Sequence, residues 1–146
     1  HIKITGYQWL WQYEYLNTGI SYYSKLSTPY SEIYNKKSKN VNYLQQVDNE
    51  LVVPINKKIR FLLTSNDVLH AWWVPDLALK RDAMPGYINE MSTIINKPGI
   101  YRGSCAELCG RHHGFMPIVI KAVTEDEYEK WLTARKVKTS GVAKIK

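Results

Sequence analysis

Two thiols, two imidazoles and a thioether fall within one short run of the sequence. Residues 105–116 read Cys-Ala-Glu-Leu-Cys-Gly-Arg-His-His-Gly-Phe-Met. Sulfur donors beside imidazole select copper or zinc over hard cations. Zinc is served by Cys and His alone, whereas a weak axial thioether such as Met116 tunes a copper redox centre. The combination therefore predicts a copper electron-transfer site.

Each of these residues taken alone has a plainer explanation. Met116 lies between Phe115 and Pro117 and can simply pack in the core. The two cysteines can be structural thiols, although a disulfide between residues only four apart closes too small a loop to contribute much stability. His112 is interpreted as a surface residue beside a functional His113. The copper hypothesis depends on all of these residues occurring together.

The number of cysteines indicates how many copper ions the site takes. A mononuclear blue copper centre needs one Cys, whereas two thiolates in one loop can bridge two coppers. Such a pair shares one electron over both metals, so its geometry changes little on oxidation and reduction. A dinuclear site also needs a second imidazole, and His70 is the obvious source. It lies in the largely apolar run Val-Leu-His-Ala-Trp-Trp-Val of residues 68–74, where a histidine outside this context is more often structural.

Length and composition indicate one globular domain. The chain has 146 residues, of which 45% are hydrophobic and 23% charged, and this size suits a single core. No window approaches the roughly 20 apolar residues of a membrane-spanning helix, and the start has no signal-peptide pattern. The net charge of +7 is concentrated in residues 36–39 and 135–146. Because no nucleic-acid motif accompanies this charge, we interpret these clusters as a solvated loop and a tail.

The hydrophobic pattern predicts mainly β-structure. Alternation of Trp9, Trp11, Tyr13 and Tyr15 predicts a strand with an aromatic face, while residues 16–48 are expected to hold little regular structure. Thr124 followed by Glu127 forms a capping box that begins one short helix. Strands punctuated by turns, with one terminal helix, favour an antiparallel sandwich or barrel. Further strands are expected at residues 51–54, 59–63, 68–74, 88–95, 100–103 and 116–123.

These residues resemble a known family, subunit II of the haem–copper cytochrome c oxidases, over roughly residues 4–131, and less closely over residues 16–48. Four motifs match in order, at residues 6–15, 67–75, 82–86 and 105–117. The resemblance implies a cupredoxin-like Greek-key β-barrel, an all-β fold with a short C-terminal helix. It also implies a dinuclear copper A centre that accepts electrons from cytochrome c and passes them to haem a in subunit I. The complete oxidase is an enzyme that translocates protons, whereas the isolated domain only transfers electrons.

The resemblance implies specific roles for the copper ligands. They are His70, Cys105, Glu107, Cys109, His113 and Met116. The two thiolates would bridge the coppers. His70 and Met116 would complete one copper, and His113 with the backbone carbonyl of Glu107 would complete the other.

The resemblance also implies further partners of the site. The Glu107 side chain would bind magnesium or manganese at the contact with subunit I, electrons would enter through Trp9, and His113 would face the exit toward haem a. Members normally begin with two transmembrane helices, so we expect residues 1–134 to be an excised copper domain and residues 135–146 a basic, flexible tail. The form of the copper loop resembles bacterial rather than mitochondrial members. The full-length protein would therefore be anchored on the periplasmic, outer face of a bacterial membrane. In a eukaryote that face is the intermembrane-space side.

Three positions depart from the family pattern. His112 replaces the usual Asn or Asp, and we predict that His113 binds copper because only His113 has the family spacing. Tyr87 stands where an Arg often follows Pro-Gly. The segment after Tyr15 lacks the acidic cluster with which many relatives attract basic cytochrome c, which together with the charge of +7 predicts an electron donor with an acidic or neutral face.

Three other functions remain as alternatives. Nitrous oxide reductase carries a similar dinuclear domain, but it has aromatic residues between its cysteines and a Glu before the Met, where this chain has Glu107 and Phe115. A copper-delivery protein would show a thioredoxin-like βαβ pattern and would not need an axial Met. A mononuclear cupredoxin-type carrier is the third alternative.

Overall fold

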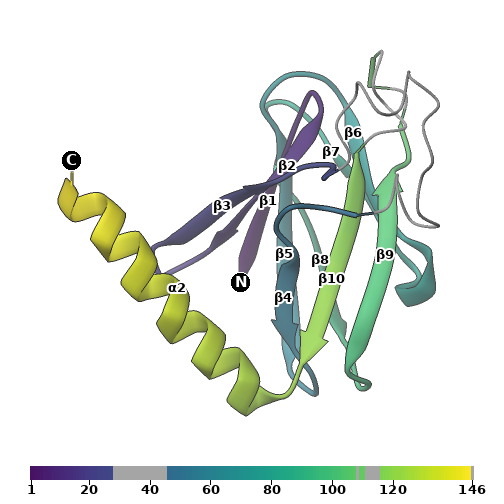
Figure 1. Cartoon of the computed structure of the whole chain (residues 1–146). Helices are drawn as coiled ribbons and strands as arrows, with labels where there is room; N and C mark the ends of the chain where they lie inside the picture. Colours follow the sequence, from purple (N-terminus) through teal and green to yellow (C-terminus); the bar gives the residue numbers. More distant parts are fainter. Residues whose placement is uncertain (28–45, 108, 111–115, 146) are drawn as a thin grey trace, which may run out of the picture.

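The computed structural model describes residues 1–27, 46–107, 109–110 and 116–145, with side chains described as far as residue 136. Two five-stranded sheets pack face to face, with one long helix running along one side (Figure 1). The first sheet has the order β3-β2-β1-β5-β8, with bounds Ile20–Ser24, Leu10–Tyr15, Ile2–Tyr7, Lys58–Ser65 and Asn89–Ile94. The second has the order β4-β10-β9-β6-β7, with bounds Leu51–Pro54, Pro117–Val123, Gly99–Cys105, His70–Val74 and Leu79–Ala83. A 3₁₀ turn, η1, covers Pro75–Leu77, and the helix α2 covers Glu125–Ile145.

The all-β, cupredoxin-like prediction is confirmed, but the sheets are mixed rather than purely antiparallel. Strand β1 pairs parallel to β5, and β4 pairs parallel to β10. The parallel pairing follows from the order in which the chain passes between the two sheets. After β3 the chain passes to the second sheet for β4 and returns to the first for β5, so β5 runs in the same direction as β1.

The structure differs from the sequence prediction in four places. The opening segment is a hairpin, β1 and β2, with Gln8 and Trp9 in its turn, rather than one strand through Trp9. Strand β3 lies in the segment expected to be irregular, and β7 lies in a stretch for which no strand was expected. The helix α2 has 21 residues and continues through residues 135–145, so it is longer than expected.

Alternating side chains of both sheets fill the space between them. Trp11 and Trp72 are the largest side chains that are fully buried there. The helix begins as predicted, because the Thr124 hydroxyl accepts a 3.3 Å hydrogen bond from the Glu127 N–H. In the part of the chain that the structure describes, no helix has the length and apolar character needed to cross a membrane.

Aromatic rings join the helix to the first sheet. The Tyr15 and Trp131 rings lie 5.0 Å apart, and the Arg135 guanidinium lies 4.5 Å above the Tyr22 ring. Tyr15 and Tyr22 also bind the second sheet, because Tyr15 donates to the Val52 carbonyl at 2.6 Å and Tyr22 donates to the Glu50 carbonyl at 2.7 Å. These contacts close the side of the sandwich where the edge strands β3 and β4 lie.

Candidate metal centre

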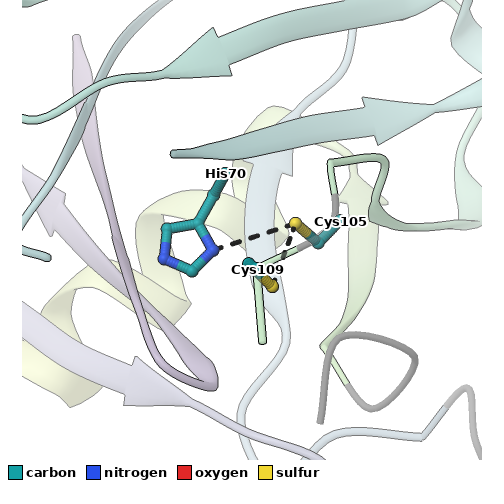
Figure 2. A group of neighbouring side chains, drawn as sticks. All are labelled: His70, Cys105 and Cys109. Atoms are coloured by element: carbon teal, nitrogen blue, oxygen red, sulfur yellow. Dashed lines mark hydrogen bonds between the residues drawn. The ribbon is translucent and has the colours of Figure 1, made fainter. Parts of the chain in front are cut away.

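One end of the sandwich holds a buried cluster of a histidine and two cysteines. His70 is the first residue of β6, Cys105 is the last residue of β9, and Cys109 lies in the loop that follows (Figure 2). Their ligand atoms all lie within 4.8 Å of one another. The exposed fractions are 0% for His70, 4% for Cys105 and 2% for Cys109. Strands from distant parts of the chain thus bring the predicted residues together.

The donor atoms form a continuous series of contacts. Nδ1 of His70 lies 3.8 Å from Sγ of Cys105, which lies 3.7 Å from Sγ of Cys109. Met116, which is 1% exposed, follows with its Sδ 3.5 Å from Sγ of Cys109. A disulfide needs about 2.05 Å between the sulfurs, so the two cysteines are free thiols. The two thiols therefore lie in the middle, with an imidazole on one side and a thioether on the other.

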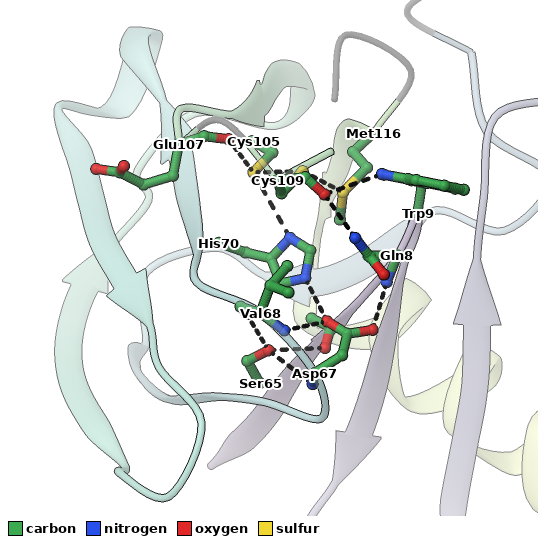
Figure 3. A network of polar contacts seen from close by, with 11 residues as sticks. Gln8, Trp9, Ser65, Asp67, Val68, His70, Cys105, Glu107, Cys109 and Met116 are labelled. Carbon is green, nitrogen blue, oxygen red and sulfur yellow. Dashed lines mark hydrogen bonds and ion pairs between the residues drawn. The ribbon is translucent and has the colours of Figure 1, made fainter. Parts of the chain in front are cut away.

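Glu107 presents its backbone to the thiols and its side chain elsewhere. The Cys105 thiol donates to the Glu107 carbonyl oxygen at 3.3 Å. Figure 3 shows the Glu107 carboxylate turned away from the sulfur atoms. The carbonyl and the carboxylate of this residue are thus available to different partners.

The carboxylate of Asp67 fixes the orientation of the His70 ring. Its Oδ1 lies 2.9 Å from Nε2 of His70, and its Oδ2 accepts a 2.8 Å hydrogen bond from the Gln8 backbone N–H (Figure 3). Partial burial of Asp67 opposes its ionisation, but these hydrogen bonds outweigh burial and hold the pKa of Asp67 below its ordinary value. The negative carboxylate keeps a proton on Nε2, so Nδ1 is the nitrogen available to a metal.

Burial makes the two thiols difficult to ionise together. Burial raises the pKa of the Cys109 thiol, and the neighbouring Cys105 adds to the rise. Burial also opposes ionisation of Cys105, but hydrogen bonds to His70, to the Ala71 and Glu107 backbone and to Cys109 together outweigh it and lower the pKa of Cys105. Two adjacent buried thiolates require positive charge nearby, and metal cations supply that charge to cysteine ligands. The donor set therefore fits a cation that favours sulfur and imidazole, as copper does.

The turn between β1 and β2 closes over the Cys109 loop. Trp9 Nε1 donates to the Cys109 carbonyl at 3.1 Å, and Gln8 Nε2 donates to the same oxygen at 3.0 Å. A Cβ added to Gly110, whose φ is +115°, would lie 2.9 Å from Gln8 Nε2, so only glycine fits here without strain. Trp9 is partly exposed. It therefore connects the surface to the backbone of a buried thiol residue.

Sequence reasoning missed the supporting roles of Asp67, Gln8 and Gly6. A Cβ on Gly6 would lie 2.6 Å from Cδ2 of His70, so this glycine makes room for the imidazole. Gly6 and Gln8 begin the first matched motif and Asp67 begins the second, but only the folded structure shows which neighbour each one supports. His112 and His113, the predicted ligand, lie outside the described residues.

Comparison with known proteins identifies the family. The profile of the cytochrome C oxidase subunit II periplasmic domain matches residues 1–123. Cytochrome c oxidase subunit 2 of Artemia franciscana is 44% identical over 131 residues, which is 90% of this chain and 56% of that protein. The same subunit of Metridium senile is 47% identical over 133 residues, covering 90% of this chain and 52% of that protein. The chain thus spans about half the length of these curated relatives.

Solved structures agree with this result. The periplasmic domain of subunit II of cytochrome oxidase (CoxB) of Bradyrhizobium japonicum has a TM-score of 0.83 and is 40% identical, with 94% of each chain covered. A mixed disulfide intermediate between the thioredoxin-like protein TlpA and subunit II of cytochrome c oxidase has a TM-score of 0.77 and 39% identity, covering 94% of this chain and 91% of that chain. The profile match over most of the chain, the curated relatives and the two shared folds lead to one conclusion. The chain belongs to the family of the periplasmic domain of cytochrome c oxidase subunit II.

Proposed function

We propose that this domain carries a dinuclear copper A centre and serves as the electron-accepting part of a haem–copper oxidase. The observation that supports this most strongly is the pair of reduced, buried thiols whose sulfurs lie 3.7 Å apart, with His70 beside one and Met116 beside the other. One isolated copper would need only one of these thiols.

Within this proposal each ligand has a defined role. Cys105 and Cys109 would hold both coppers through their thiolates. His70, Met116, His113 and the Glu107 carbonyl would supply the remaining ligands. When bound, the two coppers share one electron, so accepting or releasing an electron changes their geometry little.

The surrounding residues keep the ligands in place while the charge of the site changes. Strands β6 and β9 pair with each other and hold His70 and Cys105 at their ends. Asp67 holds the imidazole, and burial excludes water from the thiols. Such preorganisation reduces the structural cost of each electron transfer.

The proposal extends to the partners of the complete oxidase. Electrons enter at Trp9 from a cytochrome c and leave through His113 toward haem a in subunit I. The Glu107 carboxylate, turned away from the sulfurs (Figure 3), binds magnesium or manganese at the contact with subunit I. The full-length protein is anchored in the membrane with this domain on its outer, periplasmic face.

The spectrum of the copper-loaded domain tests this function. One electron shared over two coppers gives a multi-line hyperfine pattern in the EPR spectrum, and two copper ions bind per chain. A four-line pattern with one copper per chain would instead identify a mononuclear cupredoxin-type carrier. His113→Ala is expected to remove the dinuclear spectrum, and the matched control His112→Ala is expected to keep it. The reverse result would show that the assignment of the second histidine is wrong.

A further inference from the structure

One row of the first sheet lies against the imidazole of His70. Gly6 on β1 pairs with Trp11 on β2, so the two residues share one face of the sheet. A Cβ at Gly6 would lie 2.6 Å from Cδ2 of His70, and the Trp11 and His70 rings lie 5.8 Å apart in an edge-to-face arrangement. The row therefore gives the imidazole an open space at one strand and an aromatic ring at the next.

The Trp11 ring is completely buried, yet its N–H has no acceptor. Trp11 is 0% exposed. Among the side chains that the structure describes, its Nε1 is the only buried nitrogen or oxygen without a hydrogen-bond partner. The neighbour of Trp11 on β3 is Ser24, whose hydroxyl donates to the Asn49 carbonyl at 2.5 Å. A buried donor without an acceptor destabilises the folded state, so hydrogen bonding does not explain why an indole is present.

The second fully buried indole shows that the core can provide such a partner. Trp72 on β6 is also 0% exposed, and its Nε1 donates to the Tyr13 hydroxyl at 3.5 Å. Trp11 makes no equivalent bond, but it contacts the ring of His70. The size and position of the Trp11 ring, rather than its N–H, therefore account for its place in the core.

Trp11 restrains a movement of the imidazole that Asp67 leaves open. The 2.9 Å contact between Asp67 and Nε2 of His70 fixes where that nitrogen points, whereas the plane of the ring can still rock about this single bond. The Trp11 ring packs beside the imidazole and blocks the rocking. Nδ1, which lies 3.8 Å from the Cys105 sulfur, is thereby kept directed at the thiols.

The same ring affects the charge that the site can hold. In the proposed copper centre, loss of one electron makes the site more positive by one charge. An apolar surrounding that excludes water disfavours added charge, and it therefore favours the reduced state. An indole packed against a ligand of the site should raise the reduction potential, and a smaller side chain would leave space for water.

We propose that Trp11 is a positioning residue for electron transfer, because its ring holds the His70 imidazole toward the thiols and excludes water from that side of the ligand. Trp11 would thereby help to set the reduction potential of the copper centre. This inference rests on the proposed function. In the step that it serves, one electron leaves the ferrous haem of a cytochrome, which becomes ferric, and reduces the copper centre without transfer of a proton. Trp11 itself is neither oxidised nor reduced.

Two substitutions of Trp11 test its effect on the copper-loaded chain. Trp11→Leu removes the aromatic ring and should lower the equilibrium constant for one-electron reduction about tenfold, which corresponds to about 59 mV. Trp11→Phe keeps a ring beside the imidazole and should recover part of that loss. Voltammetry measures the potential. Pulsed EPR of the His70 nitrogen coupling should change in the same order, because the imidazole is no longer held at one tilt.

The metal-free chain provides a second measurement that does not depend on copper. The NMR signal of the His70 Cδ2–H group should be narrow in the unmodified chain. In Trp11→Leu it should broaden, because the imidazole then exchanges between orientations on the microsecond to millisecond timescale. Trp11→Phe should give an intermediate width.

Trp131→Phe is the matched control. Trp131 also packs against a buried aromatic residue, since its ring lies 5.0 Å from that of Tyr15, but it belongs to the helix α2. Trp131→Phe should lower the free energy of unfolding in urea and leave the reduction potential and the His70 signals unchanged. Equal shifts of the potential in Trp131→Phe and Trp11→Phe would show that Trp11 acts only through general stability, and would overturn the proposal.

The remaining outcomes separate this proposal from the copper assignment. An unchanged potential and an unchanged His70 signal in folded Trp11→Leu would contradict the positioning role. If Trp11→Leu does not fold, the same result for Trp11→Phe contradicts it. Absence of the dinuclear EPR spectrum in the unmodified chain contradicts the proposed function instead, and the width of the His70 signal in the metal-free variants then still decides whether Trp11 holds the imidazole.

Discussion

The Asp67 carboxylate lies 2.9 Å from Nε2 of His70, on the opposite side of the ring from the Cys105 sulfur. A carboxylate in this position fixes both the tautomer and the rotation of the imidazole. Since the nitrogen that faces the thiols is the one left unprotonated, the geometry for metal binding exists before any metal arrives.

Asp67→Asn is expected to weaken copper binding by about 10- to 100-fold, the usual cost of losing such a support. An amide can present its oxygen to Nε2 but carries no charge, so it holds the required tautomer less strongly. A competition titration with a copper chelator measures the change. The control is Asp76→Asn, an exposed carboxylate in the turn η1. If both variants bind copper as the unmodified chain does, Asp67 does not support the site.

Gly6→Ala is expected to disturb the site directly. The added Cβ would meet Cδ2 of His70 at 2.6 Å, and relief of such overpacking typically costs about 1–3 kcal/mol. Because the imidazole has to move, the copper-loaded spectrum should change even in the folded protein. Gly19→Ala serves as the contrast, because residue 19 has a φ of +76°, which L side chains rarely adopt, and nothing lies within 4 Å of the added Cβ. That variant should lower the free energy of unfolding measured in urea and leave the spectrum of the remaining folded protein intact.

Trp9→Phe should slow reduction by a protein donor about tenfold or more. The ring remains, but the 3.1 Å hydrogen bond to the Cys109 carbonyl is lost, while Gln8 still holds that oxygen at 3.0 Å. Stopped-flow reduction measures the rate, and hexaammineruthenium(II) should still reduce the variant normally. Trp73→Phe is the control, because Trp73 is 39% exposed on β6. Equal rates for Trp9→Phe and the unmodified chain would argue against electron transfer through the indole.

Stability should fall at alkaline pH because of Tyr22. Burial raises the pKa of Tyr22 to about 12, above its ordinary value of 10.0. The folded state favours the neutral phenol. The contribution of Tyr22 to the free energy of unfolding is therefore complete below pH 10 and is lost as the pH rises toward 12. Over that window the free energy of unfolding should fall by about 1.4 kcal/mol per pH unit for this one group. Urea unfolding at several pH values measures the slope.

Tyr22→Phe separates this titration from packing. Below pH 10 the variant should be less stable by about 1 kcal/mol, because it loses the hydrogen bond to the Glu50 carbonyl. The difference in the free energy of unfolding should narrow or reverse above pH 10, because ionisation of the Tyr22 phenol in the unfolded state then destabilises only the unmodified chain. Tyr87→Phe, at a position that is 67% exposed, should follow the unmodified chain throughout. Parallel pH curves for Tyr22→Phe and the unmodified chain would refute this explanation.

The sequence predicted most of the cluster because its chemistry is local. The run from Cys105 to Met116 contains an unusual set of donors, and β9 and the loop after it bring three of them to one place. His70 was harder, since nothing in an apolar run distinguishes a ligand from a core histidine. The role of Asp67 could not be predicted, because Ser65-Asn66-Asp67 also reads as an ordinary turn. Its contact with His70 depends on how the β5–β6 loop folds.

Strands were predicted where buried and exposed residues alternate along the sequence. A strand was missed where polar residues hide that alternation. Strand β7 contains Lys80, Arg81 and Asp82, and it pairs with β6 although its middle faces solvent. The turn at Gln8 and Trp9 contains neither Gly nor Pro, so the hairpin could not be separated into two strands from local signals. Parallel pairing of β1 with β5 depends on the path of the chain between the sheets, which no local pattern encodes.

The hydrogen bonds from Gln8 and Trp9 to Cys109 join positions about a hundred residues apart. During synthesis residues 8 and 9 therefore leave the ribosome long before the loop around Cys109 that they hold. The pocket cannot be complete until the two ends of the domain have met, and contacts of such long range form slowly. Copper binding is thus expected only after the domain has folded, because the site is incomplete before that point.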